Sequence, residues 1–266
     1  MANASPEPPV PEHRPDAGWR GPLYSTLRFI AQHVRGFAGA IVSSFSIGFV
    51  LALLATGAFV LLARVVMGGW TQRIDETVLR WFAEHRTPWL DEVMLEITIL
   101  GSGPVLTVVV LVASVFLWLT RHRWSVYILL SGIIGGQIAN SMLKNYFDRP
   151  RPATVTHIDQ VGPLSFPSGH AMTSMIVYGS IAFLVSRLEP GRRLRYGTLI
   201  VASLLILLIG TSRMYLGVHY PSDVIGGYIA GLAWIGFVVS LYVAVRFFAR
   251  RRPRTRIEEK NLIAND

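Results

Sequence analysis

The sequence contains no cysteine and few charged residues. Without cysteine, neither a disulfide framework nor a thiolate metal site can form, and nothing indicates the redox compartment. Charged residues make up 15% of the 266 positions and hydrophobic residues 52%, a balance far from that of a soluble domain of this length. The composition therefore excludes an ordinary soluble globular protein and predicts a membrane protein.

Six long runs without charge agree with this prediction. About 20 apolar residues in a helix cross the roughly 30 Å of a bilayer core. The runs are Gly36–Ala63, Ile97–Thr120, Trp124–Leu143, Ala171–Ser186, Tyr196–Ser212 and Val224–Val245. We therefore predict an all-α integral membrane protein with six transmembrane helices. The fourth and fifth runs are short for a full crossing, which suggests a site just beneath the membrane surface.

Basic residues dominate the charge, because 25 Lys and Arg outnumber 16 Asp and Glu and give a net charge of +9. They are not gathered into a soluble basic domain with interleaved aromatic residues, so nucleic acid is not an expected partner. Most lie before the first run, between the second and third, between the fourth and fifth, or after the sixth, and these segments share one side of the membrane. The positive-inside rule makes that side, with both termini, cytoplasmic.

The chain is predicted to consist of one membrane domain and two tails. Residues 1–35 are rich in proline and then weakly amphipathic, which predicts a disordered or interfacial cytoplasmic tail. The six spans form one domain over residues 36–247, and the first span is expected to be an uncleaved signal anchor. Residues 70–96 form an extracytoplasmic amphipathic segment, whose tryptophans anchor it at the interface or line a route for a lipid tail. Residues 248–266 form a basic cytoplasmic tail.

Unusual polar residues gather in the segments that join span three to span four and span five to span six. Both segments join an odd span to an even one, so both lie on the side opposite the cytoplasm, where their side chains can meet. The residues are Lys144, Arg151, Ser168, Gly169, His170, Arg213, His219 and Asp223.

The cations among these residues suit a phosphate ligand. Lys144, Arg151 and Arg213 would repel one another unless an anion joined them, and the planar fork of Arg donates two bonds to phosphate at once. Ser168 and Gly169 directly precede an apolar run, where a helix N-terminus presents unpaired backbone N–H groups to an anion. A phosphate group is therefore the expected guest.

The two histidines add acid, base and nucleophilic chemistry. His170 and His219 can change protonation near neutral pH, one as a nucleophile and one as an acid. Asp223 lies one helical turn beyond His219, a spacing that lets its carboxylate bond the imidazole. Taken singly, each of these residues could equally be an interfacial histidine, a snorkelling cation or a helix cap, and only the joint spacing favours a site.

The stretches Lys144-x6-Arg151-Pro152, Pro167-Ser168-Gly169-His170 and Ser212-Arg213-x5-His219-x3-Asp223 resemble, in order, the three signature motifs of the type 2 phosphatidic acid phosphatase family. The resemblance extends over the span pattern and implies the helical core that this family shares with haloperoxidases. A second Arg-Pro pair begins at Arg149, only five positions beyond Lys144, so Arg149 is expected to flank the motif and add to the positive field.

The resemblance also implies a mechanism. His219 would attack phosphorus, Asp223 would hold its ring, and His170 would protonate the leaving oxygen. The three cations, the Ser168 hydroxyl and the Gly169 N–H would stabilise the transition state, so no metal or other cofactor is expected. The expected enzyme is a metal-independent phosphatase of the bacterial inner membrane, surrounded by membrane lipids.

The substrate stays open at this stage. Undecaprenyl pyrophosphate, phosphatidylglycerol phosphate and phosphatidic acid all carry phosphate at the outer leaflet, and a soluble sugar phosphate is a further alternative. A non-catalytic protein that binds or transports lipid phosphates is the rival from another class, although the complete set of His170, His219 and Asp223 counts against it. Vanadate-dependent halide oxidation is a second rival, which the six spans disfavour. The sequence does not determine the oligomeric state.

Overall fold

The structure, a computed structural model, describes residues 48–159 and 162–251. Helix Gly48–Met67 opens the described chain. It is followed by α2 (Gln72–Glu84), α3 (Pro88–Ile99), α4 (Gly103–Leu119), α5 (Arg123–Phe147), α6 (Gly169–Leu188), α7 (Arg192–Tyr215) and α8 (Pro221–Arg251). Within the described residues the only extended pairing is an isolated bridge between Pro150 and Leu164. The predicted tail at 1–35 and the end of the tail from 252 onward lie outside the described residues, and α8 continues past 247.

The predicted all-α membrane fold is confirmed. Within residues 48–159 and 162–251, five helices are long and apolar enough to cross a membrane: Gly48–Met67, α5, α6, α7 and α8. Large apolar side chains such as Leu54, Ile134 and Val201 are exposed on their outer faces, as lipid contact requires. The two runs that looked short belong to longer helices, because α6 has 20 residues and α7 has 24.

The second predicted span, Ile97–Thr120, is a bent pair of helices. Helices α3 and α4 together have the length and hydropathy of one span, and they meet at an angle of 46°. The break falls where Ser102 caps α4 in an extended conformation and Pro104 follows in its first turn. Since proline has no N–H to continue the hydrogen-bond ladder of α3, a new helix starts here. If this bent pair is counted as one span, the described part of the chain has six candidate spans.

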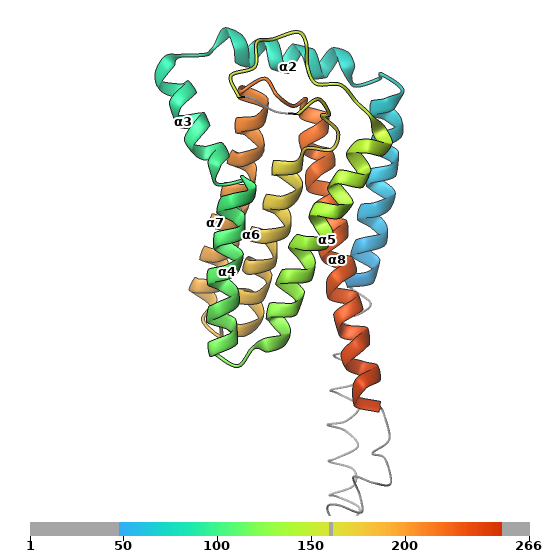
Figure 1. Cartoon of the computed structure of the whole chain (residues 1–266), viewed down its shortest axis with the longest axis vertical. Helices are drawn as coiled ribbons and strands as arrows, with labels where there is room; N and C mark the ends of the chain where they lie inside the picture. The colour runs from blue at the N-terminus through green and yellow to red at the C-terminus, as the bar shows by residue number, and fades with distance from the viewer. Residues whose placement is uncertain (1–47, 160–161, 252–266) are drawn as a thin grey trace, which may run out of the picture. The chain divides into compact units, whose positions relative to one another are not determined.

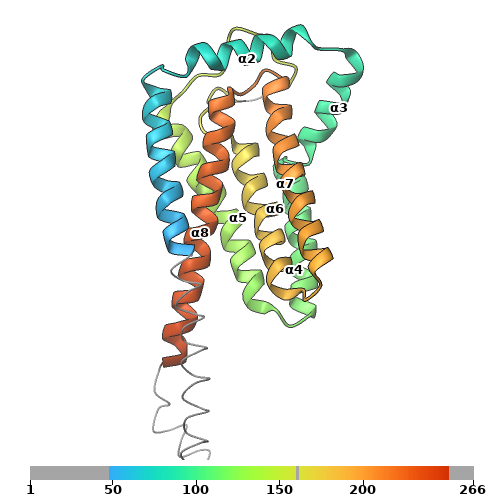
Figure 2. The same ribbon diagram turned by 180° about the vertical axis from the view of Figure 1, so that it is seen from behind.

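The predicted outer amphipathic segment, 70–96, is two helices rather than one continuous region. Thr87 is extended and caps α3, and Pro88 occupies its first position, so the chain turns between α2 and α3. Helix α2 lies across the end of the spans, and α3 then follows α7 toward the bend (Figures 1 and 2). Leu79 of α2 is fully buried against the bundle, whereas Trp81 and Trp89 are exposed. Their anchoring role stays a prediction.

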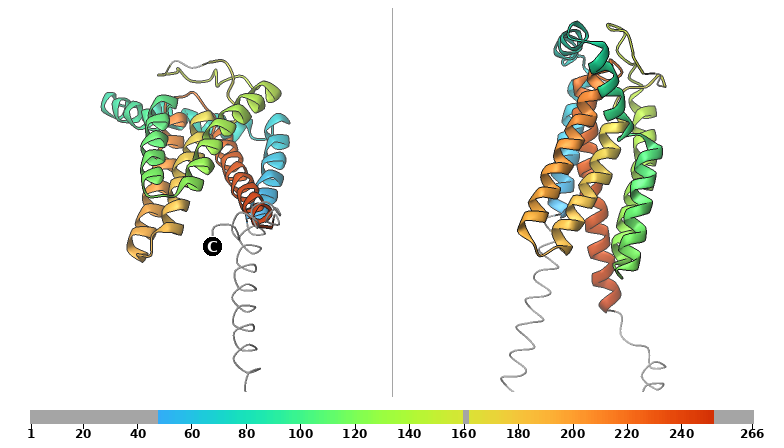
Figure 3. Two further views of the ribbon diagram at one scale, coloured as in Figure 1. Left: turned by 60° about the horizontal axis from the view of Figure 1, so that its bottom comes forward. Right: turned by 90° about the vertical axis from the view of Figure 1, so that its left-hand side faces the viewer.

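Helix α6 forms the centre of the bundle. It packs against α5, α7 and α8, and Figure 3 shows it between α7 and α4 in the side view. Gly227 of α8 makes this packing close, because a Cβ there would lie 2.6 Å from the carbonyl oxygen of Ser168 and 2.8 Å from the Cβ of Ala171. The first turns of α6 and α8 are thereby held together.

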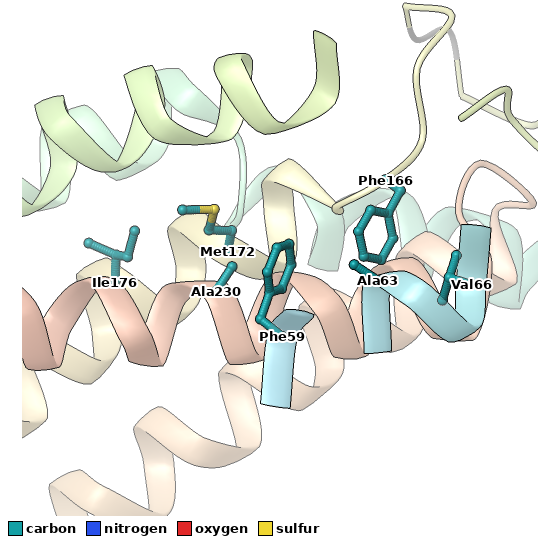
Figure 4. Close-up of a cluster of buried hydrophobic side chains, with 7 residues drawn as sticks. All are labelled: Phe59, Ala63, Val66, Phe166, Met172, Ile176 and Ala230. Atoms are coloured by element: carbon teal, nitrogen blue, oxygen red, sulfur yellow. The ribbon is translucent and has the colours of Figure 1, made fainter. Parts of the chain in front are cut away.

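An apolar cluster supports the loop that enters α6. Phe166 is fully buried and stacks on Phe59 of the first described helix, with ring centroids 5.6 Å apart, while Phe147 at the end of α5 meets its edge at 5.1 Å. Met172 and Ile176 of α6 extend the same cluster (Figure 4). Burial of these rings fixes the position of Phe166, which lies two residues before Ser168.

Candidate active site

The predicted site residues converge at one end of the bundle. The loop from α5 to α6 and the loop from α7 to α8 both lie at the end that α2 covers (Figure 1). Arg151 of the first loop reaches His219 of the second, with Nη1 3.1 Å from Nε2. The expectation that the two segments share one side of the membrane, derived from counting spans, is therefore consistent with the fold.

His219 and Asp223 form a buried pair. The Nδ1 atom of His219 lies 3.5 Å from the Oδ2 atom of Asp223, which is long for a hydrogen bond, and no other described group bonds that nitrogen. Oδ2 also accepts a bond of 2.9 Å from the N–H of Tyr220. Catalytic hydrogen bonds are commonly loose before substrate binds. The Asp223 carboxylate therefore lies close to the His219 imidazole, as the spacing predicted, at a distance longer than a hydrogen bond.

Each of the three cations is held by oxygen atoms around the site. Lys144 Nζ donates to the carbonyl oxygen of Leu164 at 2.8 Å. Arg151 donates to the carbonyl oxygens of Gly162 and, at 2.6 Å, Val218. Lysine has three donors and arginine five, so both cations keep donors for an anion after these bonds are made.

Arg213 is the most buried of the three cations, with 1% of its surface exposed. It donates from Nη1 to the Thr98 hydroxyl at 2.7 Å and to Asp159 Oδ2 at 2.8 Å. Asp159 thus forms an ion pair with this buried arginine. The Nε atom of Arg213 has no hydrogen-bond partner among the described groups, which leaves a buried donor available to a ligand.

Burial and positive charge set the protonation of the loop residues. Burial, followed by the charges of Arg151, Lys144 and Arg213, holds the pKa of His219 well below its ordinary value of 6.5. Burial, followed by the charge of Arg213, lowers the pKa of Arg151 to about 10. Near neutral pH, His219 is therefore a neutral imidazole with one unprotonated ring nitrogen, and Arg151 remains a cation.

The N-terminus of α6 faces the same space. Ser168 caps the helix and its N–H donates to the carbonyl oxygen of Asp223 at 3.0 Å, which ties the start of α6 to the start of α8. A Cβ on Gly169 would lie 3.1 Å from Asn140 Oδ1 and 3.9 Å from Lys144 Cε, so Lys144 lies beside the first turn of α6. His170, half-buried, follows in that turn. A helix N-terminus and a cation thus adjoin one another.

Two residues that the sequence did not assign to the site are joined to Asp223, Arg149 directly and Asp75 through Arg149. Arg149, expected only to flank the motif, is buried and donates from Nη1 to Asp223 Oδ1 at 2.6 Å. Asp75 of α2 accepts from Arg149 Nη2 at 3.0 Å. The sequence placed Arg149 beside the motif, and the structure adds this ion pair with Asp223. A signal existed for Asp75, because it shares a helix face with Leu79 and Phe82, where an apolar residue is expected.

Among the described residues, no group of three or more His, Asp or Glu side chains is arranged to hold a metal ion. The positive charges of Lys144, Arg151 and Arg213 all act on His219, whose Nε2 atom lies beside Arg151 and whose Nδ1 atom lies beside Asp223. Such a site suits binding and transfer of a phosphoryl group.

Comparison with known proteins agrees with this geometry. A sequence profile of the PAP2 superfamily matches residues 125–247. Phosphatidylglycerophosphatase B of Bacillus subtilis (strain 168) is 34% identical over 175 residues, which cover 65% of this chain and 86% of the relative. Undecaprenyl-diphosphatase BcrC of the same strain is 30% identical over 161 residues, covering 58% of this chain and 75% of the relative.

A solved structure extends the similarity to the fold. The crystal structure of a transmembrane PAP2 type phosphatidylglycerolphosphate phosphatase from Bacillus subtilis matches with a TM-score of 0.67 and 29% identity, covering 77% of this chain and 99% of that chain. Fold, site and relatives together define the class of this protein as a multi-pass membrane phosphatase. Within that class, the chain belongs to the PAP2 superfamily.

Proposed function

We propose that this phosphatase hydrolyses a phosphate monoester or pyrophosphate of a lipid through a phosphohistidine intermediate. The observation that carries the proposal is the position of His219. Its Nε2 atom lies 3.1 Å from Arg151 and its Nδ1 atom 3.5 Å from Asp223, so one nitrogen faces the cations and the other a carboxylate. This is the arrangement required of a nucleophile whose ring is oriented from behind.

In the proposed first step, His219 Nε2 attacks phosphorus while the bond to the leaving oxygen breaks. His170 donates a proton to that oxygen, and a bound phosphate dianion favours the protonated imidazole that this step needs. Lys144, Arg151 and Arg213 bind the equatorial oxygens, together with the Ser168 hydroxyl and the Gly169 N–H. In the second step His170, now neutral, takes a proton from water, which attacks the phosphohistidine and releases phosphate.

This proposal involves no metal or organic cofactor. The negative charge that develops on the phosphoryl oxygens in the transition state is balanced by the three cations and by the N-terminus of α6. Because these groups are fixed by carbonyl oxygens and by Asp159 before substrate arrives, little reorganisation is needed during the reaction.

A lipid substrate is supported by the surroundings of the site. An apolar cavity of about 330 Å³ lies between helix Gly48–Met67, α5 and α8, and Leu143, the residue before Lys144, lines it. An acyl or prenyl chain could occupy such a cavity while its phosphate meets Lys144. The relatives named above act on phosphatidylglycerophosphate and undecaprenyl diphosphate. We infer that the substrate of this enzyme is of the same lipid class.

We also propose that the site opens on the extracytoplasmic side of a bacterial inner membrane, with both termini in the cytoplasm. The first turn of α7, at the opposite end from the site, carries Arg192, Arg193 and Arg195, and short basic segments that join two spans remain in the cytoplasm. The chain has no cysteine, so single cysteines test the orientation cleanly. Thr154→Cys, in the exposed α5–α6 loop, should react with an impermeant maleimide in intact spheroplasts, and Arg192→Cys only after permeabilisation. The opposite pattern would refute the orientation.

The activity itself is tested with detergent-purified protein. Phosphate release is measured from phosphatidylglycerophosphate, undecaprenyl diphosphate, phosphatidic acid and a soluble sugar phosphate, each with and without a chelator, for wild type and His219→Ala. We expect release from a lipid that persists with chelator and is lost in the variant, and an acid-labile phosphoenzyme in wild type only. A folded wild-type protein that binds these lipids without releasing phosphate would instead support the binding or transport function.

A further inference from the structure

Three buried charged side chains connect the outer helix α2 to the proposed nucleophile. Arg149 Nη1 donates to Asp223 Oδ1 at 2.6 Å, and Arg149 Nη2 donates to Asp75 Oδ2 at 3.0 Å. We call these residues the Asp75–Arg149–Asp223 network. Only 2% of Asp75, 8% of Arg149 and none of Asp223 is exposed to solvent. Such burial is costly for charges, so the geometry of the network is under tight constraint.

The network also fixes the start of α8. Asp75 Oδ1 accepts from the Ser222 N–H at 3.0 Å, and Asp75 Oδ2 accepts from the Ser222 hydroxyl at 2.6 Å. Arg149 Nη1 donates to the same hydroxyl at 2.8 Å, and its guanidinium lies 4.3 Å from the ring centre of Tyr220. Tyr220 and Ser222, which lie three residues and one residue before Asp223, are thus in contact with Arg149, and Ser222 is also bound to α2.

The two oxygens of Asp223 have different partners as a result. Oδ1 is bound by Arg149, and this leaves Oδ2 toward the Tyr220 N–H and His219 Nδ1. Arg149 alone would neutralise the Asp223 carboxylate. With Asp75 present, two carboxylates share one guanidinium, so the network keeps one net negative charge behind the imidazole. That charge favours the cationic ring formed when His219 attacks phosphorus.

We propose that Asp75 and Arg149 are positioning residues of this enzyme, acting on His219 through Asp223, and that α2 is therefore a functional part of the active site. The inference rests on the proposed phosphohistidine mechanism. Neither residue contacts the space in front of His219 Nε2, so neither is expected to bind the phosphate. Their effect is therefore on the rate of phosphoryl transfer and not on substrate binding.

The test compares Asp75→Asn and Arg149→Lys with matched controls on α2. In Asp75→Asn the amide oxygen can still accept from the Ser222 N–H but the negative charge is lost, and in Arg149→Lys the ammonium cannot span two carboxylates as a guanidinium does. Glu84→Gln removes a carboxylate from the exposed end of the same helix. Arg80→Lys alters an arginine whose contact with Glu76 is exposed and 3.9 Å long. Initial rates give kcat and KM, and rapid quenching gives the rate at which the phosphoenzyme forms.

We expect kcat and phosphoenzyme formation to fall about 10- to 100-fold in Asp75→Asn and Arg149→Lys, as for loss of one charged hydrogen bond, with KM little changed. Both controls should stay within about twofold of wild type. The double variant should lose much less than the product of the two single losses, because both act on one carboxylate. If these variants fail to fold, Ser222→Ala provides a milder test, because it removes only the hydroxyl that bonds both Asp75 and Arg149. We expect its kcat to fall about 3- to 10-fold.

A purely structural role predicts a different result. Folded variants with wild-type kcat and a lowered thermal midpoint, or with the loss confined to KM, would overturn the proposal. Failure of the proposed function is distinguishable from this outcome, because it would appear in wild type as turnover without a trapped phosphohistidine. Whether or not a phosphohistidine is trapped in the wild type, the comparison of kcat among the variants tests the positioning role of Asp75 and Arg149.

Discussion

A methyl group at position 227 would separate the first turns of α6 and α8, which carry His170 and Asp223. In Gly227→Ala, the new Cβ would lie 2.6 Å from the Ser168 carbonyl oxygen, 2.8 Å from the Ala171 Cβ and 3.1 Å from the Met172 backbone nitrogen, where ordinary contact begins at 3.4 Å. Most of these atoms belong to the backbone of α6, so no side-chain rotation can relieve the overlap. Helix α8 must instead move away from the first turn of α6, by roughly 0.5 to 1 Å.

The expected consequences are a less stable and much slower enzyme. Overpacking of this kind costs about 1 to 3 kcal/mol of unfolding free energy. The shift moves His170, on α6, away from His219 and Asp223 on the α8 side, and a misplacement of about 1 Å can reduce a rate on the order of 100-fold. We therefore expect Gly227→Ala to lower both the thermal midpoint and kcat, the latter by about 10- to 100-fold.

The measurement pairs thermal unfolding in detergent with kcat on the preferred lipid. Gly57→Ala serves as the control, because a Cβ at that helical position would meet no other atom within 4 Å. It should leave kcat unchanged. If Gly227→Ala had the kcat and thermal midpoint of the control, α6 and α8 would not be in close contact at the site, and the reasoning would be refuted.

Three further predictions concern the charges around the nucleophile. The pKa of His219 is lowered well below 6.5. The activity kcat/KM should therefore fall only below pH 6.5, where this ring gains a proton and loses its lone pair. A fall that begins above pH 6.5 would contradict the assignment of His219 as the nucleophile. Asp159→Asn frees Arg213 from a competing carboxylate, so the inhibition constant of inorganic phosphate should fall, and an unchanged constant would argue against this competition. Arg213→Lys replaces a fork with a point charge, and kcat/KM should drop about 10-fold or more relative to Arg193→Lys at the opposite end.

Much of the site could be predicted from local sequence patterns. The uncharged runs marked the spans because a bilayer core admits only helices of a certain length and polarity. Counting spans then placed Lys144, Arg151 and His170 on the same side as Arg213 and His219. The spacing of His219 and Asp223 predicted that their side chains lie close together, and they are found 3.5 Å apart, with His219 in the loop before α8 and Asp223 in the first turn of α8.

Other features depend on contacts that no local pattern encodes. The sequence showed no reason for Thr98 to bond Arg213, because the contact joins positions 115 residues apart and requires the bend between α3 and α4. Likewise, the pairing of Asp159 with Arg213 joins positions 54 residues apart and depends on the position of α7.

The sequence by itself determined that this is a helical membrane protein with a phosphate site of cations and histidines at one end. Hydropathy and motif spacing are local properties, and they are readable without knowing which helices touch. Only the tertiary structure decided that α2 folds across that end and brings Asp75 onto Ser222, 147 residues away, and onto Arg149. The direction in which a short amphipathic helix lies is set by what its buried face can contact, and the partners of a buried charge are chosen by the packing of the whole bundle.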